Sequence, residues 1–409
     1  MHILFIHDAF PAQFGRLGLE LVDRYGWQCS YLVRNLTRCP EPTPEMIARL
    51  QIHRYTLPPG RDADDSTPWP RIYGRFVEQC RAVREALKSL PGSRPDLVVA
   101  NGGRGAPTLF VPEAFDAPIV TYCEYYFGRT HRDLTYRLDL EPAEPALFFP
   151  RVINAPTLAS LASARAGYSA THWQRDSFPE RYRHKIEAHF DGIDDRLYAP
   201  GPRPKSIGGR SVPDDVKVIT YVARGLESVR GFDLFIAVAE RIARERSDVL
   251  FVIAGDERAY YGWDHFHTGG KPFKDWTLER STIDRSRLLF LGHVPPETLA
   301  DVLRRSDLHL YLTVPFVVSW SLFNALSTGL VVLGADIDPI VEVIEPGVTG
   351  LVAPLFDVDL MAETALRVLN NPAEFAPLGR AGRRRIEERY GLDAAVPPIK
   401  EFFERVAGG

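Results

Sequence analysis

The sequence has few of the features that mark secreted or membrane-spanning proteins. Its 409 residues contain only four cysteines, which are Cys29, Cys39, Cys80 and Cys123. No two of them form a CxxC pair, so we expect free thiols in a reducing compartment. No apolar run approaches the roughly 20 residues that cross a bilayer, and the opening stretch MHILFIHDAF lacks the basic region and cleavage site of a signal peptide. These absences predict a cytoplasmic protein without a transmembrane segment.

An excess of one charge is also missing. The chain has 49 lysines and arginines against 53 aspartates and glutamates, which gives a net charge of −4, and both signs are mixed along the sequence. Without a basic tail or stripe, nucleic acid is not an expected partner. A P-loop and a GxSxG elbow are absent as well. The short motifs that mark two common classes of α/β enzyme are therefore missing.

Metal-binding patterns are equally sparse. The stretch HFH places His265 and His267 two residues apart, but no third ligand is evident nearby. Zinc sites need three or four protein ligands, so we predict a surface loop here and no bound metal. His293, in the strand-like stretch RLLFLGHV, is instead counted among the candidate ligand-binding residues of the second half.

What the chain does have is an alternation of buried strands and amphipathic helices. Strand-like stretches in the first half are HILFIH, QCSYLVRN, PDLVVANGG and APIVTYCEYY, and those in the second half are VKVITYVARG, VLFVIAGDE, RLLFLGHV, LHLYLTV, LVVLGAD and VTGLVAP. Helical periodicity lies between them, for example in PRIYGRFVEQCRAVREALKSL and FDLFIAVAERIARER. Such alternation predicts parallel sheets covered by helices on both faces. The predicted fold class is α/β, with two Rossmann-like, doubly wound domains facing each other across a cleft.

The boundary between the two domains is marked by APGPRPKSIGGRSVPDD, which is rich in Pro, Gly and Ser and has no periodicity. We expect an N-terminal domain over residues 1–200, a linker over 201–215 and a C-terminal domain over 216–390. Residues 391–409 are predicted to form a terminal helix that can cross back to the N-terminal domain. In doubly wound folds the ligand binds at the carboxyl ends of the strands, which is where a site is expected.

The loops that follow the first strand of each domain carry candidate ligand-binding residues. In the first domain, FPAQFGRLG contains Gly15 and Gly18, which let the backbone approach a ligand or simply allow tight packing. In the second domain, VARGLESVRGFD carries Arg224 and Arg230, the latter directly before a glycine and a helix. Two guanidiniums beside a helix start can donate bidentate hydrogen bonds to a diphosphate. The alternative is a pair of solvated loop arginines.

A third candidate is the stretch SWSLFNALSTG. Ser319 and Ser321 lie at the expected start of a helix, where a hydroxyl either caps the helix or binds a phosphate oxygen. Asn324 falls off the apolar face of that helix, toward the loop side, where its amide can donate or accept a hydrogen bond. Capping needs no ligand, so the stretch predicts either a capped helix or a phosphate site.

Together these motifs resemble those of bacterial family-4 glycosyltransferases with the GT-B fold, over nearly the whole chain. MHILFIHDAFPAQFGRLG looks like the family's N-terminal strand and glycine loop, and SATHWQRDSFPERYRHKIEAHFDGID like the segment that closes its N-terminal domain. VARGLESVRGFD is similar to the family's Arg-x5-Lys element, with Arg230 in place of the lysine. SLFNALSTGLVVLGADIDPIVEVIEPGVTGLV is similar to the stretch that usually reads LLEAMACGTPVV, followed by an acidic element and a glycine turn.

The resemblance implies a hexosyltransferase-type enzyme that uses a nucleotide-diphosphate sugar and retains the configuration at the anomeric carbon. Arg224 and Arg230 would grip the diphosphate, and Glu342 would lie near the donor. The backbone N–H groups around Ser321 and Leu322 would meet the distal phosphate. The resemblance implies neither a cofactor nor a divalent metal. It leaves open the base and sugar of the donor and the sugar acceptor, which could be a glycan, a lipid-linked sugar, a natural product or a protein.

The family's glycine loop, here at Gly15, would close over the same phosphates from the N-terminal domain. The sequence departs from the family pattern elsewhere. The Glu-x7-Glu pair falls on Phe316 and Asn324, and only the amide can still accept a hydrogen bond from the ribose. The family's histidine in the N-terminal domain maps to Cys123, with Glu124 beside it as a candidate on the side of the sugar acceptor.

These departures leave two alternatives to an active transferase open. The first is a catalytically degenerate GT-B protein that binds a nucleotide sugar or acts as a partner subunit. The second is a nucleotide-sugar epimerase or a phosphorylase of the same fold.

Overall fold

The computed structural model describes most of the chain. The described ranges are residues 1–36, 42–57, 68–92, 94–101, 108–128, 133–137, 139–140 and 144–408. The chain divides into two compact units. The first unit contains Met1–Phe127, Phe148–Gly192 and Leu392–Gly409, and the second contains Gly128–Leu147 and Ile193–Gly391. The second unit is therefore built from most of the second half of the chain together with a short excursion from the first half.

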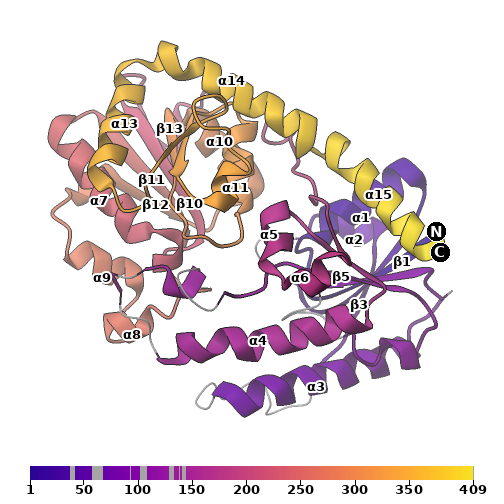
Figure 1. The fold of residues 1–409 in the computed structure, drawn as a ribbon. Helices are drawn as coiled ribbons and strands as arrows, with labels where there is room; N and C mark the ends of the chain where they lie inside the picture. Colours follow the sequence, from indigo (N-terminus) through magenta and orange to yellow (C-terminus); the bar gives the residue numbers. More distant parts are fainter. Residues whose placement is uncertain are drawn as a thin grey trace. The chain divides into compact units, whose positions relative to one another are not determined.

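In the described residues, the first unit is built on a seven-stranded parallel sheet with the order β3-β2-β1-β4-β5-β6-β7 (Figure 1). Its strands are β1 (His2–Phe10), β2 (Gln28–Leu36), β3 (Gln51–Arg54), β4 (Leu97–Asn101), β5 (Ile119–Tyr122), β6 (Ala166–Ser169) and β7 (Ile186–Ala188). Along β1, Ile3 and Phe5 pack into one hydrophobic cluster, and Leu4 and Ile6 pack into another. Side chains alternate between the two faces of a strand, so both faces of β1 are covered. This explains why its sequence is a continuous apolar run.

Helices cover both faces of this sheet. They are α1 (Phe14–Tyr25), α2 (Pro44–Arg49), α3 (Pro68–Lys88), α4 (Glu144–Ser163), α5 (His172–Ser177), α6 (Glu180–Arg183) and α15 (Leu392–Gly408), with the 3-10 turn η1 (Val111–Glu113). The first residues of α4 belong to the second unit. α15 contributes Val396, Ile399 and Phe403 to the same hydrophobic cluster as Ile3. The C-terminal helix is therefore an integral part of the first unit.

The glycine-containing stretch after β1 is a helix rather than the predicted loop. β1 continues to Phe10, a turn follows, and α1 begins at Phe14, so Gly15 and Gly18 both lie inside the helix. A Cβ atom on Gly18 would lie 1.8 Å from the hydroxyl oxygen of Tyr31, which donates a hydrogen bond to the Phe14 carbonyl (2.8 Å). Gly18 therefore allows the helix to pack closely on the sheet, which was one of its two predicted roles.

Within the described part of the second unit, a six-stranded parallel sheet has the order β12-β11-β10-β13-β14-β15 (Figure 1). Its strands are β10 (Lys217–Gly225), β11 (Val249–Asp256), β12 (Leu288–Gly292), β13 (Leu308–Tyr311), β14 (Val332–Ala335) and β15 (Leu351–Ala353). The chain moves outward from β10 to β12 on one side and from β13 to β15 on the other. This is the order of a doubly wound sheet, and its switch point lies between β10 and β13. The predicted α/β class is confirmed for both units.

The remaining elements of the second unit cover this sheet or lead to it. The helices are α7 (Phe232–Glu245), α8 (His265–Thr268), α9 (Phe273–Glu279), α10 (Pro296–Arg305), α11 (Trp320–Ser327), α12 (Asp338–Val341), α13 (Val358–Asn370) and α14 (Pro372–Arg389). The 3-10 turns are η2 (Asp133–Thr135), η3 (Ser228–Arg230) and η4 (Arg285–Arg287). Among them, η3 and α11 matter most for function, because they follow the two strands at the switch point.

The stretch predicted as a linker, residues 201–215, contains a packed hairpin. Strands β8 (Ser206–Ile207) and β9 (Arg210–Ser211) pair antiparallel around two glycines with positive φ. Ile207 and Val212 are buried in a hydrophobic cluster with Val218 of β10. Each strand of the hairpin has only two residues, which is too short for a hydrophobic periodicity, so the sequence predicts a linker here instead. These residues belong to the second unit.

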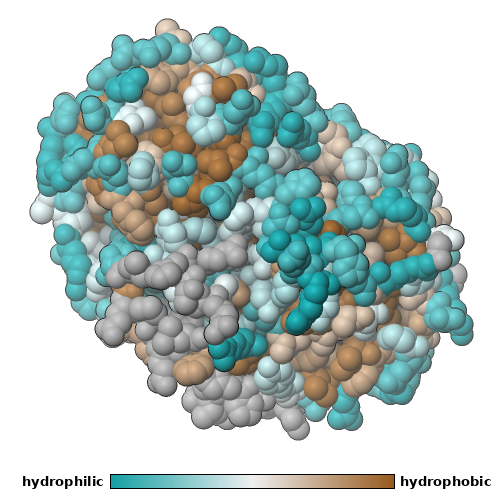
Figure 2. Space-filling view, in the orientation of Figure 1, coloured by the Kyte–Doolittle hydropathy of each residue, from teal (hydrophilic) through white to brown (hydrophobic). Residues whose placement is uncertain are grey.

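No helix within the described ranges is both long enough and apolar enough to cross a bilayer. Figure 2 shows a visible face that is mostly hydrophilic, with smaller hydrophobic areas. The exposed large apolar residues are Leu36, Ile47, Tyr73, Val77, Leu109, Phe148, Phe266, Val348, Phe356 and Leu360. Scattered apolar residues of this kind are ordinary on protein surfaces.

Candidate functional site

The candidate residues of the second unit gather at the carboxyl ends of β10 and β13. Arg224 lies near the end of β10, and η3 with Arg230 follows it directly before α7. Ser319 and Ser321 follow β13 at the start of α11. Ligands of doubly wound sheets bind in the crevice at this switch point. The structure therefore brings two separate candidate stretches of the sequence to the same edge of one sheet.

Arg230 is a buried cation at this edge. The residue is 6% exposed, and its Nη1 donates hydrogen bonds to the hydroxyl of Thr313 (3.2 Å) and the carbonyl of Val317 (3.0 Å). Its guanidinium carbon lies 5.2 Å from the ring centre of Tyr261 and 5.3 Å from that of Phe316. Among the described residues no carboxylate forms an ion pair with Arg230, and its buried Nε has no acceptor. Burial acts to lower the pKa of Arg230 and the nearby Glu227 carboxylate helps to raise it, but without an ion pair the buried cation is costly to desolvate, so this position favours an anionic ligand.

The backbone around Arg230 is fixed through its carbonyl groups. The carbonyl of Val229 accepts hydrogen bonds from the N–H of Val314 (3.0 Å) and the hydroxyl of Thr313 (3.2 Å). The carbonyl of Arg230 accepts one from the hydroxyl of Tyr221 (2.9 Å). Burial raises the pKa of Tyr221 well above its ordinary value, so this hydroxyl remains a donor. The arginine is therefore held in position without a ligand, as electrostatic stabilisation of a reacting anion requires.

Arg224 and Arg230 both contact Tyr261, and Arg224 also contacts Tyr260. Arg224 is exposed, and its Nη1 donates a hydrogen bond to the hydroxyl of Tyr261 (3.3 Å). Its guanidinium carbon lies 4.3 Å from the ring centre of Tyr260, and that of Arg258 lies 4.4 Å from the same centre. Cations are attracted to aromatic faces at such distances. Tyr261 thus contacts both predicted arginines and Tyr260 contacts Arg224 alone. Sequence reasoning missed both tyrosines.

A buried glutamate holds the tyrosine loop in place. Glu227 is fully buried, and its Oε2 accepts hydrogen bonds from the backbone N–H groups of Tyr260 (2.9 Å), Tyr261 (2.8 Å) and Gly262 (2.9 Å). Burial raises the pKa of the Glu227 carboxyl, and the hydrogen bonds from the backbone oppose that shift. Sequence reasoning missed Glu227 too. The available signal was an acidic residue between the two arginines in VARGLESVRG, whose partner loop lies far away in the sequence.

Ser319 caps the start of α11. The sequence predicted either such a cap or a phosphate site here. The Oγ of Ser319 accepts a hydrogen bond from the N–H of Ser321 (3.3 Å), and its carbonyl accepts one from the N–H of Leu322 (3.1 Å). The N–H of Ser319 itself donates to the hydroxyl of Tyr311 (2.7 Å). The N–H groups that the family resemblance assigns to a phosphate are therefore engaged in the cap in this structure. A phosphate would have to replace the Ser319 hydroxyl as the acceptor of the Ser321 N–H and the Ser319 carbonyl as the acceptor of the Leu322 N–H.

The two departures from the family pattern have different surroundings. Phe316 is 4% exposed, and its ring lies against the guanidinium of Arg230 and 5.1 Å from the ring of Tyr261. Asn324 is 8% exposed, and within the described chain its side-chain amide has no hydrogen-bond partner. Phe316 therefore covers the arginine where a carboxylate would neutralise it, whereas Asn324 keeps an amide available for a ligand.

Glu342 and His293 lie farther along the same sheet. Glu342 ends α12 after β14, and its carbonyl accepts a hydrogen bond from Nη2 of Arg385 (3.0 Å). His293 is exposed and directly follows the edge strand β12. Neither is hydrogen-bonded or ion-paired to Arg230 in the described residues. Their predicted roles beside the donor stay predictions.

Two protein-family models match the chain, one in each half. The model described as Glycosyl transferase family 4 group matches residues 28–197, and the model described as Glycosyl transferases group 1 matches residues 216–371. The chain belongs to the family-4 glycosyltransferases with the GT-B fold. The family that the sequence motifs resemble is thereby confirmed.

Similarity to known proteins and solved structures supports the same family assignment. N-acetyl-alpha-D-glucosaminyl L-malate synthase of Bacillus anthracis is 23% identical over 218 residues, which cover 53% of this chain and 53% of that protein. HepE of Anabaena, solved in complex with UDP and glucose, has a TM-score of 0.69 at 15% identity, with 99% of this chain and 100% of that chain covered. Sucrose-phosphate synthase from Thermosynechococcus elongatus has a TM-score of 0.73 at 15% identity, with 100% and 99% covered. The chain spans about half the length, or less, of the curated relatives it matches. The structural likeness establishes the GT-B fold.

The two candidate residues of the first unit are Gly15 and Glu124. Gly15 lies in the first turn of α1, where a Cβ atom would be 2.3 Å from Cβ of Pro11, so the turn after β1 requires glycine here. Glu124 is exposed just after β5, and its carbonyl accepts a hydrogen bond from Nε2 of Gln174 (2.6 Å). Cys123, at the position of the family's histidine, is buried, which raises the pKa of its thiol and keeps it protonated. Both candidates lie at the carboxyl end of the first sheet.

Asp191 is a buried carboxyl group near Glu124. It is 2% exposed, and its Oδ1 accepts a hydrogen bond from the hydroxyl of Tyr168 (3.3 Å). Burial raises the pKa of Asp191 to about 7, although hydrogen bonds from Tyr168 and Tyr122 act in the opposite direction. The folded first unit therefore retains a proton over a pH range in which the unfolded chain loses it.

We expect Asp191 to make the protein less stable as the pH rises from about 4 to about 7. The carboxyl ionises near 3.8 in the unfolded chain and near 7 in the fold, so the folded state binds more protons between these values. The free energy of unfolding should fall across this window, and Asp191→Asn should flatten the slope. Urea unfolding of both proteins at about pH 5 and about pH 8 measures the effect. An unchanged slope in the variant would contradict the assignment.

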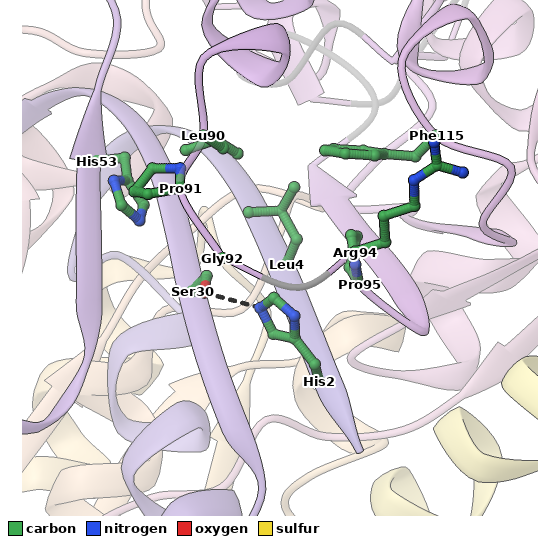
Figure 3. A pocket seen from close by; sticks show the side chains of 10 residues that line it. All are labelled: His2, Leu4, Ser30, His53, Leu90, Pro91, Gly92, Arg94, Pro95 and Phe115. Carbon is green, nitrogen blue, oxygen red and sulfur yellow. Dashed lines mark hydrogen bonds between the residues drawn. The ribbon is translucent and has the colours of Figure 1, made fainter.

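A small cavity of about 40 Å³ lies at the opposite end of the first sheet (Figure 3). It is lined from the amino ends of the strands by residues that include His2 of β1, Ser30 of β2 and His53 of β3. His2 Nε2 and Ser30 Oγ are hydrogen-bonded at 2.8 Å. A space of this size holds at most a few water molecules, and ligands of doubly wound sheets bind at the carboxyl ends. The cavity is therefore not the site of this GT-B family member.

The histidine stretch at His265 and His267 forms the one-turn helix α8 rather than the predicted surface loop. Gly269, with φ of 63°, ends this turn in the left-handed conformation that favours glycine. The described residues contain no group of three His, Cys, Asp or Glu side chains that could hold a metal ion.

Proposed function

We propose that the protein transfers a sugar from a nucleotide-diphosphate sugar to an acceptor, and that Arg230 and Arg224 bind the diphosphate. The observation that carries this proposal is the buried Arg230 at the switch point, which has a fixed backbone and no carboxylate ion-pair partner among the described residues. Family membership supports it, and so does the complex of Anabaena HepE with UDP and glucose. The sugar would be a hexose or a close relative of one.

The proposed chemistry breaks the bond between the anomeric carbon and the diphosphate and forms one to a hydroxyl oxygen of the sugar acceptor. Negative charge builds on the leaving diphosphate, and positioned guanidiniums stabilise that charge in the transition state. The proton of the attacking hydroxyl passes to the leaving phosphate, so no separate base is required. We propose retention at the anomeric carbon. We also propose metal independence, because two arginines supply the positive charge that the diphosphate needs.

A second candidate is a GT-B protein that binds a nucleotide sugar without turning it over. The observation in its favour is Phe316, whose ring occupies the place of the family's first glutamate beside Arg230. A phenyl ring makes no hydrogen bond to a sugar hydroxyl, so substrate orientation would be weaker. Release of free nucleoside diphosphate from the donor, in the presence of candidate acceptors, distinguishes a transferase from a binding protein.

We further propose that the protein works in the cytoplasm. Three thiols support this placement, because Cys29, Cys80 and Cys123 are buried and unpaired. Unpaired thiols are the rule in reducing compartments.

A thermal-shift screen against UDP, GDP, dTDP and ADP, with their common sugar conjugates, tests the proposed donor site. A ligand that binds only the folded state adds about 2.7 kcal/mol of stability at 100 times its dissociation constant. We expect one nucleotide to raise the unfolding temperature clearly more than the others, and that nucleotide names the donor. Absence of any shift would overturn the proposed function.

Asn324→Glu is expected to tighten nucleotide binding. A carboxylate accepts stronger hydrogen bonds from ribose hydroxyls than an amide does, and Asn324 has no competing partner in the described structure. A gain of about 1–1.4 kcal/mol corresponds to roughly a fivefold to tenfold increase in affinity. Titration calorimetry measures it, with Asn324→Gln as the neutral control of equal length. Unchanged affinity in Asn324→Glu would show that Asn324 does not face the ribose.

A further inference from the structure

A segment that leads from β5 toward α4 belongs to the second unit and packs against the rest of that unit. We call its described residues, 133–137 and 139–140, the crossing segment. The N–H of Asp133 donates a hydrogen bond to the carbonyl of Pro315 (3.2 Å), in the loop between β13 and α11. The ring of Tyr136 stacks on that of Phe356, which follows β15, at 5.8 Å between centres. The crossing segment therefore lies against loops at the carboxyl ends of the second sheet, the same edge that carries Arg230.

Arg137 of the crossing segment is 5% exposed, and all five of its N–H donors are used. Nε and Nη2 donate to the carboxylate of Asp139 (2.8 and 2.6 Å), and Nη1 and Nη2 to that of Asp233 (3.0 and 2.6 Å). Nη1 also donates to the carbonyl of Ser228 (3.1 Å). No donor is left for a phosphate. Arg137 therefore acts on the protein around it rather than on a ligand.

The groups that Arg137 contacts lie on both sides of Arg230. Ser228 comes two residues before it, and the N–H and hydroxyl of Ser228 both donate to the carboxylate of Asp264 (3.0 Å from the N–H). Asp233 comes three residues after Arg230, in the first turn of α7. One guanidinium therefore braces the turn that carries Arg230 at its beginning and at its end.

We propose that Arg137 is a positioning residue of the diphosphate site, which fixes η3 so that Arg230 meets its ligand in one arrangement. This inference rests on the proposed function, because it concerns the same anion site. Displacement of a binding group by about 1 Å can cost roughly 100-fold in function. The bonds from Arg137 prevent such a displacement by holding the carbonyl of Ser228 and the start of α7 together.

The variant Arg137→Lys tests this role. Lysine keeps the positive charge between Asp139 and Asp233 but offers three donors instead of five and no planar fork. Arg305→Lys is the matched control, because Arg305 is 1% exposed in the same unit and donates to carbonyls just before β10, at the opposite end of the sheet. Both variants and the wild type are compared by thermal unfolding. They are also titrated calorimetrically with whichever of UDP, GDP, dTDP and ADP binds the wild type.

Both lysine variants are expected to unfold at lower temperature, but only Arg137→Lys should lose nucleotide affinity, by roughly 10- to 100-fold. A milder variant, Asp139→Asn, removes the negative charge and one of the two oxygens that accept from Arg137, at a side chain that is 49% exposed. It should lose part of that affinity while folding normally. Wild-type affinity in both Arg137→Lys and Asp139→Asn would overturn the positioning role and leave the proposed function standing. An equal loss in Arg305→Lys and Arg137→Lys would also overturn it, because general destabilisation would then explain the loss. A wild type that binds none of the four nucleotides would overturn the proposed function and this inference with it.

Discussion

Replacing Arg230 by methionine is expected to weaken nucleotide binding strongly and to change the stability of the unliganded protein much less. Arg230 is a buried cation without an ion-pair partner in the described residues, so the fold bears the cost of desolvating its charge. The nearby Glu227 carboxylate and the hydrogen bonds to Thr313 and Val317 offset this cost, so removing the charge and these interactions together should change stability little. Loss of a charged donor to a buried anion costs roughly 2–5 kcal/mol, which is roughly 30- to 4,000-fold in affinity. Titration calorimetry with the nucleotide found in the screen measures the first effect, and thermal unfolding without ligand measures the second.

The control for this substitution is Arg305→Met. Arg305 is equally buried but donates to three carbonyl groups near the amino end of the sheet, so its removal takes a buried donor from each of them, and among the described residues only the Pro213 carbonyl keeps another, the N–H of Val216. We expect Arg305→Met to lower the unfolding temperature and to keep nucleotide affinity, the reverse of Arg230→Met. If Arg230→Met bound the nucleotide normally, the diphosphate would have to lie elsewhere.

The second large effect is expected at Glu227. Glu227→Ala removes the acceptor shared by three backbone N–H groups in the loop of Tyr260 and Tyr261. Each buried N–H left without an acceptor costs about 1–3 kcal/mol. The loop that covers both arginines should also loosen, so nucleotide affinity should fall together with stability.

Glu227→Gln separates charge from geometry. The amide oxygen can accept the same three hydrogen bonds but binds them less strongly than a carboxylate. Urea unfolding should rank the wild type above Glu227→Gln and the glutamine variant above Glu227→Ala. Equal stability of the alanine and glutamine variants would mean that the three hydrogen bonds contribute little.

The sequence predicts the architecture well, because strands buried on both faces must be apolar throughout. Strands such as β1 and β10 are therefore recognisable without any tertiary information. The prediction of a loop at Gly15 and Gly18 was wrong for a local reason, because α1 already begins at Phe14. Its N-cap residue, Gln13, makes no side-chain capping bond, so the sequence offers no start signal before the glycines. The hairpin at residues 206–211 was missed because strands of two residues show no periodicity.

Only those residues of the candidate site that can be recognised within one short segment were predictable from the sequence. The arginines and the serine cap were found because each lies beside a helix start, which has recognisable chemistry. The contact between Glu227 and the loop of Tyr260 and Tyr261 was not predicted, because it joins residues more than thirty positions apart. The contact between Arg137 and Asp233 lies within the second unit but joins residues 96 positions apart in the sequence. Neither the periodicity nor a motif within one segment can predict a contact between two distant segments.

The departures from the family pattern change the electrostatics of the site. Phe316 covers Arg230 with a ring face, so the arginine keeps its full positive charge for a ligand, whereas a glutamate there would partly neutralise it. Under the proposed function, this arrangement favours binding of the diphosphate over contacts to the sugar.

The most direct measurement compares a nucleoside diphosphate with the corresponding monophosphate and nucleoside by titration calorimetry, on the wild type and on Arg230→Met. If the buried arginine binds the diphosphate, the wild type should bind the diphosphate at least about tenfold more tightly than the monophosphate. That difference should disappear in Arg230→Met. Equal affinity of the wild type for all three compounds would contradict a diphosphate site at Arg230.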